Sequence, residues 1–475
     1  MIKQYYSLTI FYLQGGCMRK IRIISILLAL SMLASFASTL KAEKYTIPVE
    51  YHKLKNGLKV VLSPDPTAPT VVVAVYYNIG FRIEPRNRTG FAHLFEHMMF
   101  QGSQNLGKME FIRLIQNNGG VLNGSTRFDF TNYFEVVPAH KLETVLWAEA
   151  DRMRGLSITQ DNLTNQQGVV TNEVKVNVLN QPYGGFPWLD MPQRANTNWY
   201  NAHNFYGELS DLSAATLKDV KDFFHTYYAP NNAALILTGD FDSEEAMRLI
   251  ERHFADIPAV TQPAKPNLRE PRQTKEKKFS KPDPLAKRPG LAFSYHMPER
   301  FTPEYFAMGI IYQILAAGDD SLLTEMLVKK KGYAAEVNTA INELGNMYDY
   351  NGPMLFTVWL FHDTQVKANE ILATTDSAIK ELQTKPIDEA TMKRAMVKLR
   401  SDLYDTVDFM FGFGRADLLA CFALFNDDPA RINKIEEEFL KVTPELIQKT
   451  AKEYLRPSNR TILTIEPKAS TKKEE

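Results

Sequence analysis

Residues 90–100 constrain this chain most, because they set two histidines and a glutamate inside an apolar stretch. The segment reads Gly-Phe-Ala-His-Leu-Phe-Glu-His-Met-Met-Phe, so His93, Glu96 and His97 form the pattern His-x-x-Glu-His. On a helix, His93 and His97 lie one turn apart on the same face, where both imidazoles can reach a single ion. Zinc favours nitrogen ligands, and a catalytic zinc site combines three protein ligands with a water.

The alternative is a pair of ordinary core histidines. A lone histidine on an apolar face usually is one, but two that bracket a glutamate at this spacing arise by chance in about one such chain in a hundred. The apolar neighbours predict a buried helix, and buried polar groups need a hydrogen-bond partner or a metal. The pattern therefore favours a metal site, for which a third ligand must lie elsewhere in the sequence.

The charge balance excludes one large class of function. The 475 residues include 55 Lys and Arg and 55 Asp and Glu, so the formal net charge is zero. A nucleic-acid-binding protein would carry a basic excess, so we expect no nucleic-acid partner. The length is sufficient for two or more domains, and a hydrophobic content of 44% is typical of a folded globular protein.

The N-terminus has the features of an export signal. Basic residues at 19–22 precede the apolar run 23–33, and small residues follow up to a cleavage site near Ala42. We expect residues 1–42 to be removed and the mature protein to be periplasmic, without stable insertion in a membrane. The alternatives are secretion and an uncleaved N-terminal anchor.

Cysteine usage agrees with this expectation only if the core is large. Cys17 and Cys421 are the two cysteines, and removal of the signal leaves Cys421 alone. The mature chain would therefore have no internal disulfide and would depend on its core for stability.

The chain from residue 45 mixes strand and helix patterns, which predicts an α+β fold. Strands are expected at 58–62 and 71–77 and in a hairpin over 121–137, and helices at 109–117, 138–154 and 159–179.

Glu173 is a carboxylate on the expected apolar stripe of the last of these helices. Steps of three and four residues from it reach Val169, Val170 and Val176. A carboxylate on an apolar face is costly unless it is paired or bound to a metal. The alternative is a surface glutamate in a helix of different register.

Two further stretches lack a regular pattern. Residues 181–204 combine aromatic residues with Gly and Pro, and we expect a loop that either lines a substrate cavity or packs as an ordinary loop. Residues 260–289 are rich in Pro and Lys and indicate a linker. This linker would separate a metal-binding domain at 43–259 from a second domain at 290–475.

The two parts that flank the linker are related by an internal repeat. Five residues recur at a constant offset of 227: Thr216, Val220, Tyr227, Pro230 and Asn232 correspond to Thr443, Ile447, Tyr454, Pro457 and Asn459. Such a long period predicts two copies of one domain. At this offset the metal motif would fall on Asp320, Leu323 and Thr324, so we expect the chemistry in the first copy only.

The motif, the repeat and Glu173 together resemble the pitrilysin/insulinase family of zinc peptidases, the inverted zincins, which includes the mitochondrial processing peptidase. The resemblance covers nearly the whole chain after the signal. It implies two homologous α+β half-domains, each a mainly antiparallel sheet flanked by helices. The family's third ligand is a glutamate about 75 residues after the motif, and 75 residues separate His97 from Glu173.

The resemblance implies a zinc metalloendopeptidase that acts on peptides or unfolded polypeptides. One Zn²⁺ per chain would be held by His93, His97 and Glu173, and Glu96 would act as the general base on a zinc-bound water. A non-catalytic structural or assembly subunit of the same family is the alternative function.

The resemblance also implies where the peptide binds. Asn123, Gly124, Ser125 and Thr126 are similar to the family's Asn-Ala-x-Thr edge strand, which would pair with the substrate backbone. Gly124 stands where the family usually has alanine.

Two departures from the family point to a partner. Gln166 occupies a position seven residues before Glu173 where the family often has a glutamate. Members that act alone carry an Arg and a Tyr seven residues apart in the later half. Tyr333 matches the tyrosine, but Met326 stands in place of the arginine. We therefore expect a homo- or heterodimer with a similar chain.

Overall fold

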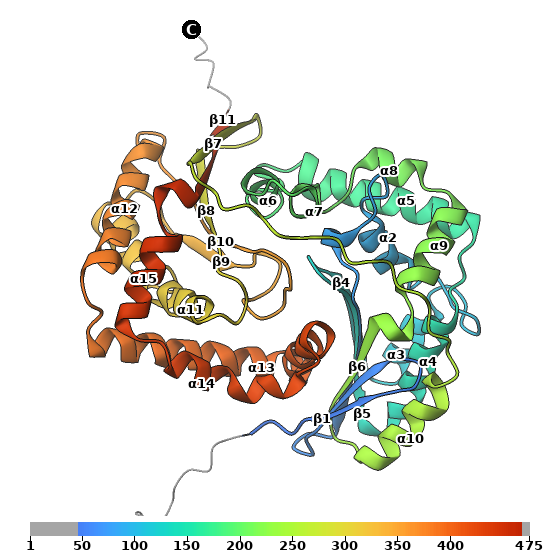
Figure 1. Ribbon diagram of the computed structural model, residues 1–475. Helices are drawn as coiled ribbons and strands as arrows, with labels where there is room; N and C mark the ends of the chain where they lie inside the picture. The colour runs from blue at the N-terminus through green and yellow to red at the C-terminus, as the bar shows by residue number, and fades with distance from the viewer. Residues whose placement is uncertain (1–45, 468–475) are drawn as a thin grey trace, which may run out of the picture. The chain divides into compact units, whose positions relative to one another are not determined.

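The computed structural model describes residues 46–467, so the expected export signal lies outside the described residues. Two sheets organise this part of the chain (Figure 1). The first has the order β1-β2-β6-β3-β5-β4 and comprises β1 (Glu50–Lys53), β2 (Lys59–Pro64), β3 (Thr70–Tyr77), β4 (Val121–Thr126), β5 (Thr131–Pro138) and β6 (Ala233–Gly239). The second has the order β7-β11-β8-β10-β9 and comprises β7 (Lys277–Asp283), β8 (Gly290–His296), β9 (Asn338–Ile341), β10 (Leu355–Phe361) and β11 (Arg460–Pro467).

The two sheets have the same topology once β1 is set aside. In each, the first strand runs parallel to the last, and the other neighbouring strands pair antiparallel. The predicted offset recurs in the structure, since β6 begins at Ala233 and β11 begins 227 residues later at Arg460. The internal repeat and the α+β fold class are therefore confirmed.

Strand β7 corrects the linker expectation, because it lies inside residues 260–289. It is the first strand of the second repeat and pairs with β11. Its alternating burial and its lysines are typical of an edge strand, which hydrogen-bonds on one side only and often carries charged residues. The composition that indicated a linker therefore also suits a sheet edge.

Helices cover one face of the first sheet. They are α2 (Phe91–Met98), α3 (Glu110–Asn117), α4 (Leu142–Arg154), α5 (Gln160–Val174), α8 (Leu209–Ala214), α9 (Leu217–Tyr227) and α10 (Ser243–Phe254). Val71, Val73 and Val75 of β3 pack into the core beneath them. The intervening residues of β3 are also buried, so both faces of this strand are covered.

The second sheet has its own helices, α11 (Pro303–Leu315), α12 (Ala368–Thr384) and α15 (Pro444–Tyr454), which Figure 1 shows on one side of β7–β11. The long helix α13 (Glu389–Asn426) is followed by α14 (Ile435–Leu440). Among residues 46–467, no helix combines the length and the apolar character needed to cross a membrane.

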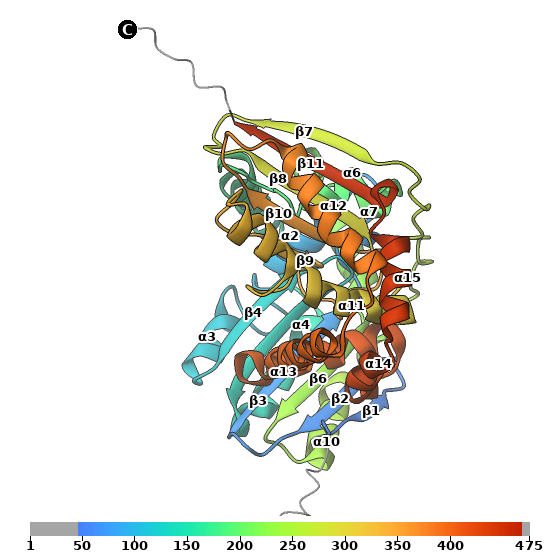
Figure 2. The ribbon, with the colours of Figure 1, turned by 90° about the vertical axis from the view of Figure 1, so that its left-hand side faces the viewer.

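Each sheet is covered on its other face by an element of the other repeat. Helix α13 packs on the first sheet, where the Tyr76 hydroxyl donates to Asp417 at 2.7 Å (Figure 2). Helix α6 (Asp190–Ala195) packs on the second sheet, where Met191 contacts its apolar core. The expectation of a plain loop at 181–204 was therefore wrong, since α6 and α7 (Trp199–Ala202) form there. Contact with the other repeat stabilises helices too short to show an apolar periodicity.

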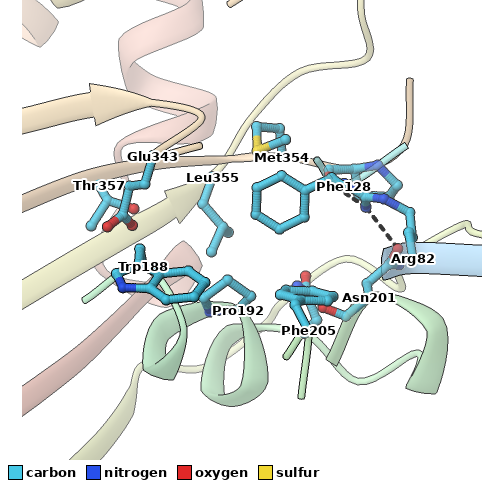
Figure 3. Close-up of a pocket in the computed structure, with 12 residues that line it drawn as sticks. Arg82, Phe128, Trp188, Pro192, Asn201, Phe205, Glu343, Met354, Leu355 and Thr357 are labelled. Carbon is cyan, nitrogen blue, oxygen red and sulfur yellow. Dashed lines mark hydrogen bonds between the residues drawn. The ribbon is translucent and has the colours of Figure 1, made fainter. Parts of the chain in front are cut away.

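A buried polar network joins the repeats at a pocket lined by both (Figure 3). Arg82 pairs with Asp129 at 3.0 Å and donates to Asn201 and to the carbonyl of Pro353. Asp129 in turn accepts the backbone N–H of Asn351 at 2.8 Å. Because these charges are fully buried, the network stabilises one arrangement of the two repeats around it.

Candidate metal centre

Three side chains with metal-binding atoms converge between α2 and α5. The Nε2 atoms of His93 and His97 lie 3.3 Å apart. The carboxylate oxygens of Glu173 lie 3.5 Å from the Nε2 of His93 and 3.2 Å from that of His97. Within residues 46–467, these three form the one group of at least three His, Cys, Asp or Glu residues whose donor atoms all lie within 4.8 Å of one another.

The donor set fits a zinc ion. Two imidazole nitrogens and a carboxylate that face one another present lone pairs to a common point, which a cation satisfies. Two nitrogens and one oxygen are a ligand set typical of catalytic zinc, and they leave one coordination position open. The cluster of His93, His97 and Glu173 is called the metal cluster below.

Burial and charge tune the protonation of the metal cluster in a direction that suits coordination. Burial lowers the pKa of His93, so its imidazole is neutral near pH 7. The hydrogen bond from His97 and the positive charges nearby lower the pKa of Glu173, which keeps it ionised. Burial alone would lower the pKa of His97, but the hydrogen bond and charge of Glu173 outweigh it and raise that pKa.

The register of α5 differs from the sequence-based expectation. Val169 and Val176, expected on the same stripe as Glu173, are both exposed. The buried stripe of the helix runs through Leu163, Gln166, Val170 and Val174. Glu173 lies at the flank of that stripe and is half-buried, which lets it reach the imidazoles without entering the core.

Tyr206 is a residue that the sequence analysis missed. Its hydroxyl donates to Glu173 at 3.0 Å, and its ring packs edge-on against His93 with centroids 5.0 Å apart. Trp188 packs against the other part of the same ring. The aromatic stretch at 181–204 ended two residues short of Tyr206, and no sequence spacing connects this tyrosine with Glu173.

Glu96 lies outside the metal cluster and is oriented by the neighbouring strand. The Thr126 hydroxyl at the end of β4 donates to its carboxylate at 2.6 Å. Gly124 of the same strand faces Tyr133, and a methyl group there would lie 3.1 Å from its ring. The Tyr133 hydroxyl donates to the carbonyl of Phe95, so this strand and helix α2 are held together beside Glu96.

Asn123 and Ser125 lie on the opposite face of β4 from Glu96. Strand alternation separates them from Gly124 and Thr126, and Asn123 is exposed. No strand within the described residues pairs with the outer edge of β4, so its backbone groups are free to bind another chain. Tyr333 is not brought to this region, because its backbone contacts are with Leu327 and Asp363 in the second repeat.

The second repeat has no equivalent of the metal cluster. The helix between its second and third strands is α11, Pro-Glu-Tyr-Phe-Ala-Met-Gly-Ile-Ile-Tyr-Gln-Ile-Leu, which contains no histidine. Asp320, Leu323 and Thr324, named by the constant offset, lie after this helix, because the repeats differ in loop length. The expectation of one metal motif per chain agrees with both alignments.

Comparison with known proteins gives two family matches. Residues 59–183 match "Insulinase (Peptidase family M16)", and residues 214–399 match "Peptidase M16 inactive domain". The zinc protease PqqE of Helicobacter pylori is 26% identical over 448 residues, which cover 92% of this chain and 97% of that protein.

Solved structures share the fold along most of the chain. The crystal structure of a protease from Helicobacter pylori gives a TM-score of 0.81 at 25% identity and covers 89% of this chain and 100% of that one. The periplasmic protease PqqL from Escherichia coli gives a TM-score of 0.71 at 16% identity. That match covers 89% of this chain but 48% of PqqL, so PqqL is about twice as long as the matched region.

Proposed function

Because this chain belongs to the insulinase family of peptidases, family M16, we propose that it is a zinc metalloendopeptidase that hydrolyses peptides or unfolded polypeptides. The convergence of His93, His97 and Glu173 within 4.8 Å is the observation that supports the proposal most. The match to the "inactive domain" does not count against it, since that match covers residues 214–399, beyond all three of these side chains.

The proposed chemistry divides between the metal and the side chains around it. Zn²⁺ bound by the metal cluster supplies a Lewis acid that lowers the pKa of a water and polarises the scissile carbonyl. Glu96 takes a proton from the attacking water and later delivers it to the leaving amine. Thr126 holds the Glu96 carboxylate in one orientation, and Tyr206 does the same for Glu173.

The free edge of β4 provides the proposed binding site for the peptide backbone. A substrate in extended conformation adds to the edge through main-chain hydrogen bonds, a mode that tolerates many sequences. Thr126 lies at the end of this strand and contacts Glu96, so a peptide bound along β4 passes the general base. Asn123, Gly124 and Ser125 would contact the same peptide.

The proposed setting is export and pairing. The periplasmic location of PqqL and the expected signal at residues 1–42 support a periplasmic enzyme. The length of PqqL supports pairing, because two chains of the present kind would supply the same number of repeats as one PqqL chain. Met326 in place of the expected arginine agrees with a partner that supplies this contact to the substrate.

Metal analysis combined with peptide cleavage tests the proposal. The wild-type protein is expected to hold one zinc per chain and to cleave unfolded polypeptides. Glu96→Gln should retain the zinc and lose hydrolysis, whereas His93→Ala should lose the zinc itself. Glu208→Gln, at an exposed position, is the matched control and should change neither property. Full activity of Glu96→Gln, or zinc-free wild-type protein with full activity, would refute the assignment.

A further inference from the structure

Helix α13 is interrupted by a turn that exposes three large apolar side chains. Phe409, Met410 and Phe411 have exposed fractions of 57%, 40% and 76%. Met410 and Phe411 also have positive φ angles of 48° and 57°, in the left-handed region that residues other than glycine seldom adopt. Backbone strain and clustered exposed apolar side chains both tend to occur at functional surfaces. Phe409, Met410 and Phe411 are called the apolar turn below.

The residues after the apolar turn attach it to the first sheet. Phe413 stacks on Phe134 of β5, with ring centroids 3.7 Å apart and planes at 23°. The Thr238 hydroxyl of β6 donates to the carbonyl of Gly412 at 3.3 Å. The turn is therefore held at a defined place on the face of the sheet that α13 covers.

Strand register connects this place to the free edge of β4. Phe134 is the partner of Asn123, and Val136 is the partner of Val121. Paired residues of antiparallel strands point to the same face, so Val121 and Asn123 share the face on which Phe413 stacks. Val121 is itself 50% exposed. Apolar groups thus lie on this one face of β4, β5 and α13.

The same face is separated from the metal cluster by the length of β4. Thr126, which contacts Glu96, is five residues from Val121, a separation of about 17 Å along an extended strand. A peptide that lies along β4 directs every second side chain to this face. Residues of the peptide about five positions from the scissile bond would therefore lie over Val121 and towards the apolar turn.

We propose that Val121, the Phe134–Phe413 pair and the apolar turn form a subsite that binds large apolar side chains of the peptide, about five residues from the cleaved bond. The inference rests on the proposed function and adds a substrate class to it, namely polypeptides with alternating apolar residues. Asp408 and Phe411 line the same pocket, so an acidic side chain there is disfavoured. The occupant is extended substrate, because the subsite continues the free edge of β4.

Binding to the Glu96→Gln protein tests the subsite without the need for cleavage. The probes are two fluorescein-labelled 12-residue peptides of Ser, Thr and Gln, one with Phe and one with Asp at two alternate positions near one end. Each is made in both chain directions, and affinities are measured by fluorescence anisotropy. The Phe peptide is expected to bind about tenfold more tightly in one direction. The double variant Phe409→Ser/Phe411→Ser should abolish this preference.

Val397→Ser is the control, since Val397 is an exposed apolar residue on the same helix, before the turn. It should leave the preference for Phe unchanged. Val121→Asp provides an independent second variant on β4 and should reduce the preference as well. Sedimentation of each variant shows whether the oligomeric state changes.

The inference is overturned if the double variant keeps the tenfold preference. It is also overturned if that variant loses self-association and keeps the preference, because the turn would then be a subunit interface. If the Phe preference is present but the wild-type protein cleaves no peptide, the subsite stands and the proposed function fails. If the wild type cleaves both peptides and neither binding nor cleavage distinguishes Phe from Asp, the function stands and the subsite fails.

Discussion

The carboxylate of Glu84 accepts the backbone N–H of Ala92 at 2.6 Å, directly beside His93. It also accepts the N–H of Gly90 at 2.8 Å, so both bonds are at the first turn of α2. A buried negative charge at this end of a helix is stabilised by the unpaired N–H groups and by the helix dipole. The sequence analysis missed Glu84, because its role depends on the loop that returns it to the helix.

We expect Glu84→Gln to weaken zinc binding about tenfold and to destabilise the fold by about 2 kcal/mol. The amide keeps a hydrogen-bond acceptor but loses the charge that strengthens both bonds to α2. Zinc affinity from competition with a chelator and thermal unfolding measure the two effects. Glu208→Gln is the control, and equal zinc affinities for the wild type and Glu84→Gln would show that Glu84 does not position the helix.

Tyr206→Phe should lower zinc affinity about tenfold with little effect on stability. The substitution removes one hydrogen bond to a ligand and keeps the ring that packs on His93. The same chelator competition measures it. Tyr200→Phe is a suitable control, because it removes a tyrosine hydroxyl on α7 and leaves the metal cluster untouched. An unchanged dissociation rate of zinc would contradict the role given to Tyr206.

Thr126→Val should reduce kcat by 10- to 100-fold while zinc content stays at one per chain. Valine has nearly the shape of threonine but cannot donate to Glu96, so the general base loses its orientation. Steady-state cleavage of a quenched fluorescent peptide separates kcat from KM. Loss of zinc, or a change confined to KM, would instead indicate damage to the metal cluster or to peptide binding.

Stability should fall between about pH 4 and pH 7 through Asp349. Burial and the charge of nearby Asp417 raise the pKa of Asp349 to about 7. Because the folded protein holds this proton more tightly than the unfolded chain, the stabilisation is complete below pH 4 and is lost as the pH rises through 7. Asp349→Asn should remove on the order of 3 kcal/mol of this pH dependence.

Thermal unfolding from pH 5 to pH 8 measures the effect. The wild-type melting temperature should fall relative to that of Asp349→Asn across this range. Asp388→Asn, at a fully exposed helix cap, should leave the difference between the two pH values close to that of the wild type. Parallel curves for the wild type and Asp349→Asn would exclude a proton held at this position.

Local patterns in the sequence predicted much of the framework. The His-x-x-Glu-His spacing depends only on helix geometry, so two imidazoles one turn apart followed once α2 was helical. The repeat likewise predicted that α15 and β11 follow the order of α9 and β6. Val169 and Val176 show the limit of this reasoning, since apolar character alone did not reveal which face of α5 packs against α2.

Contacts between distant parts of the chain were beyond sequence reasoning. The lysine-rich strand β7 became recognisable only through its pairing with β11. The exchange of α6 and α13 between the sheets likewise has no local signature, because an apolar run reports burial but not the partner that buries it.

The amino-acid sequence by itself determined the fold class, the duplication and the identity of the candidate metal ligands, because each depends on short-range periodicity or on a repeated spacing. The tertiary structure alone decided which groups orient those ligands and where apolar side chains stay exposed. Tyr206, Thr126 and Glu84 reach their partners by long-range packing, and such packing depends on the whole set of contacts rather than on any one segment.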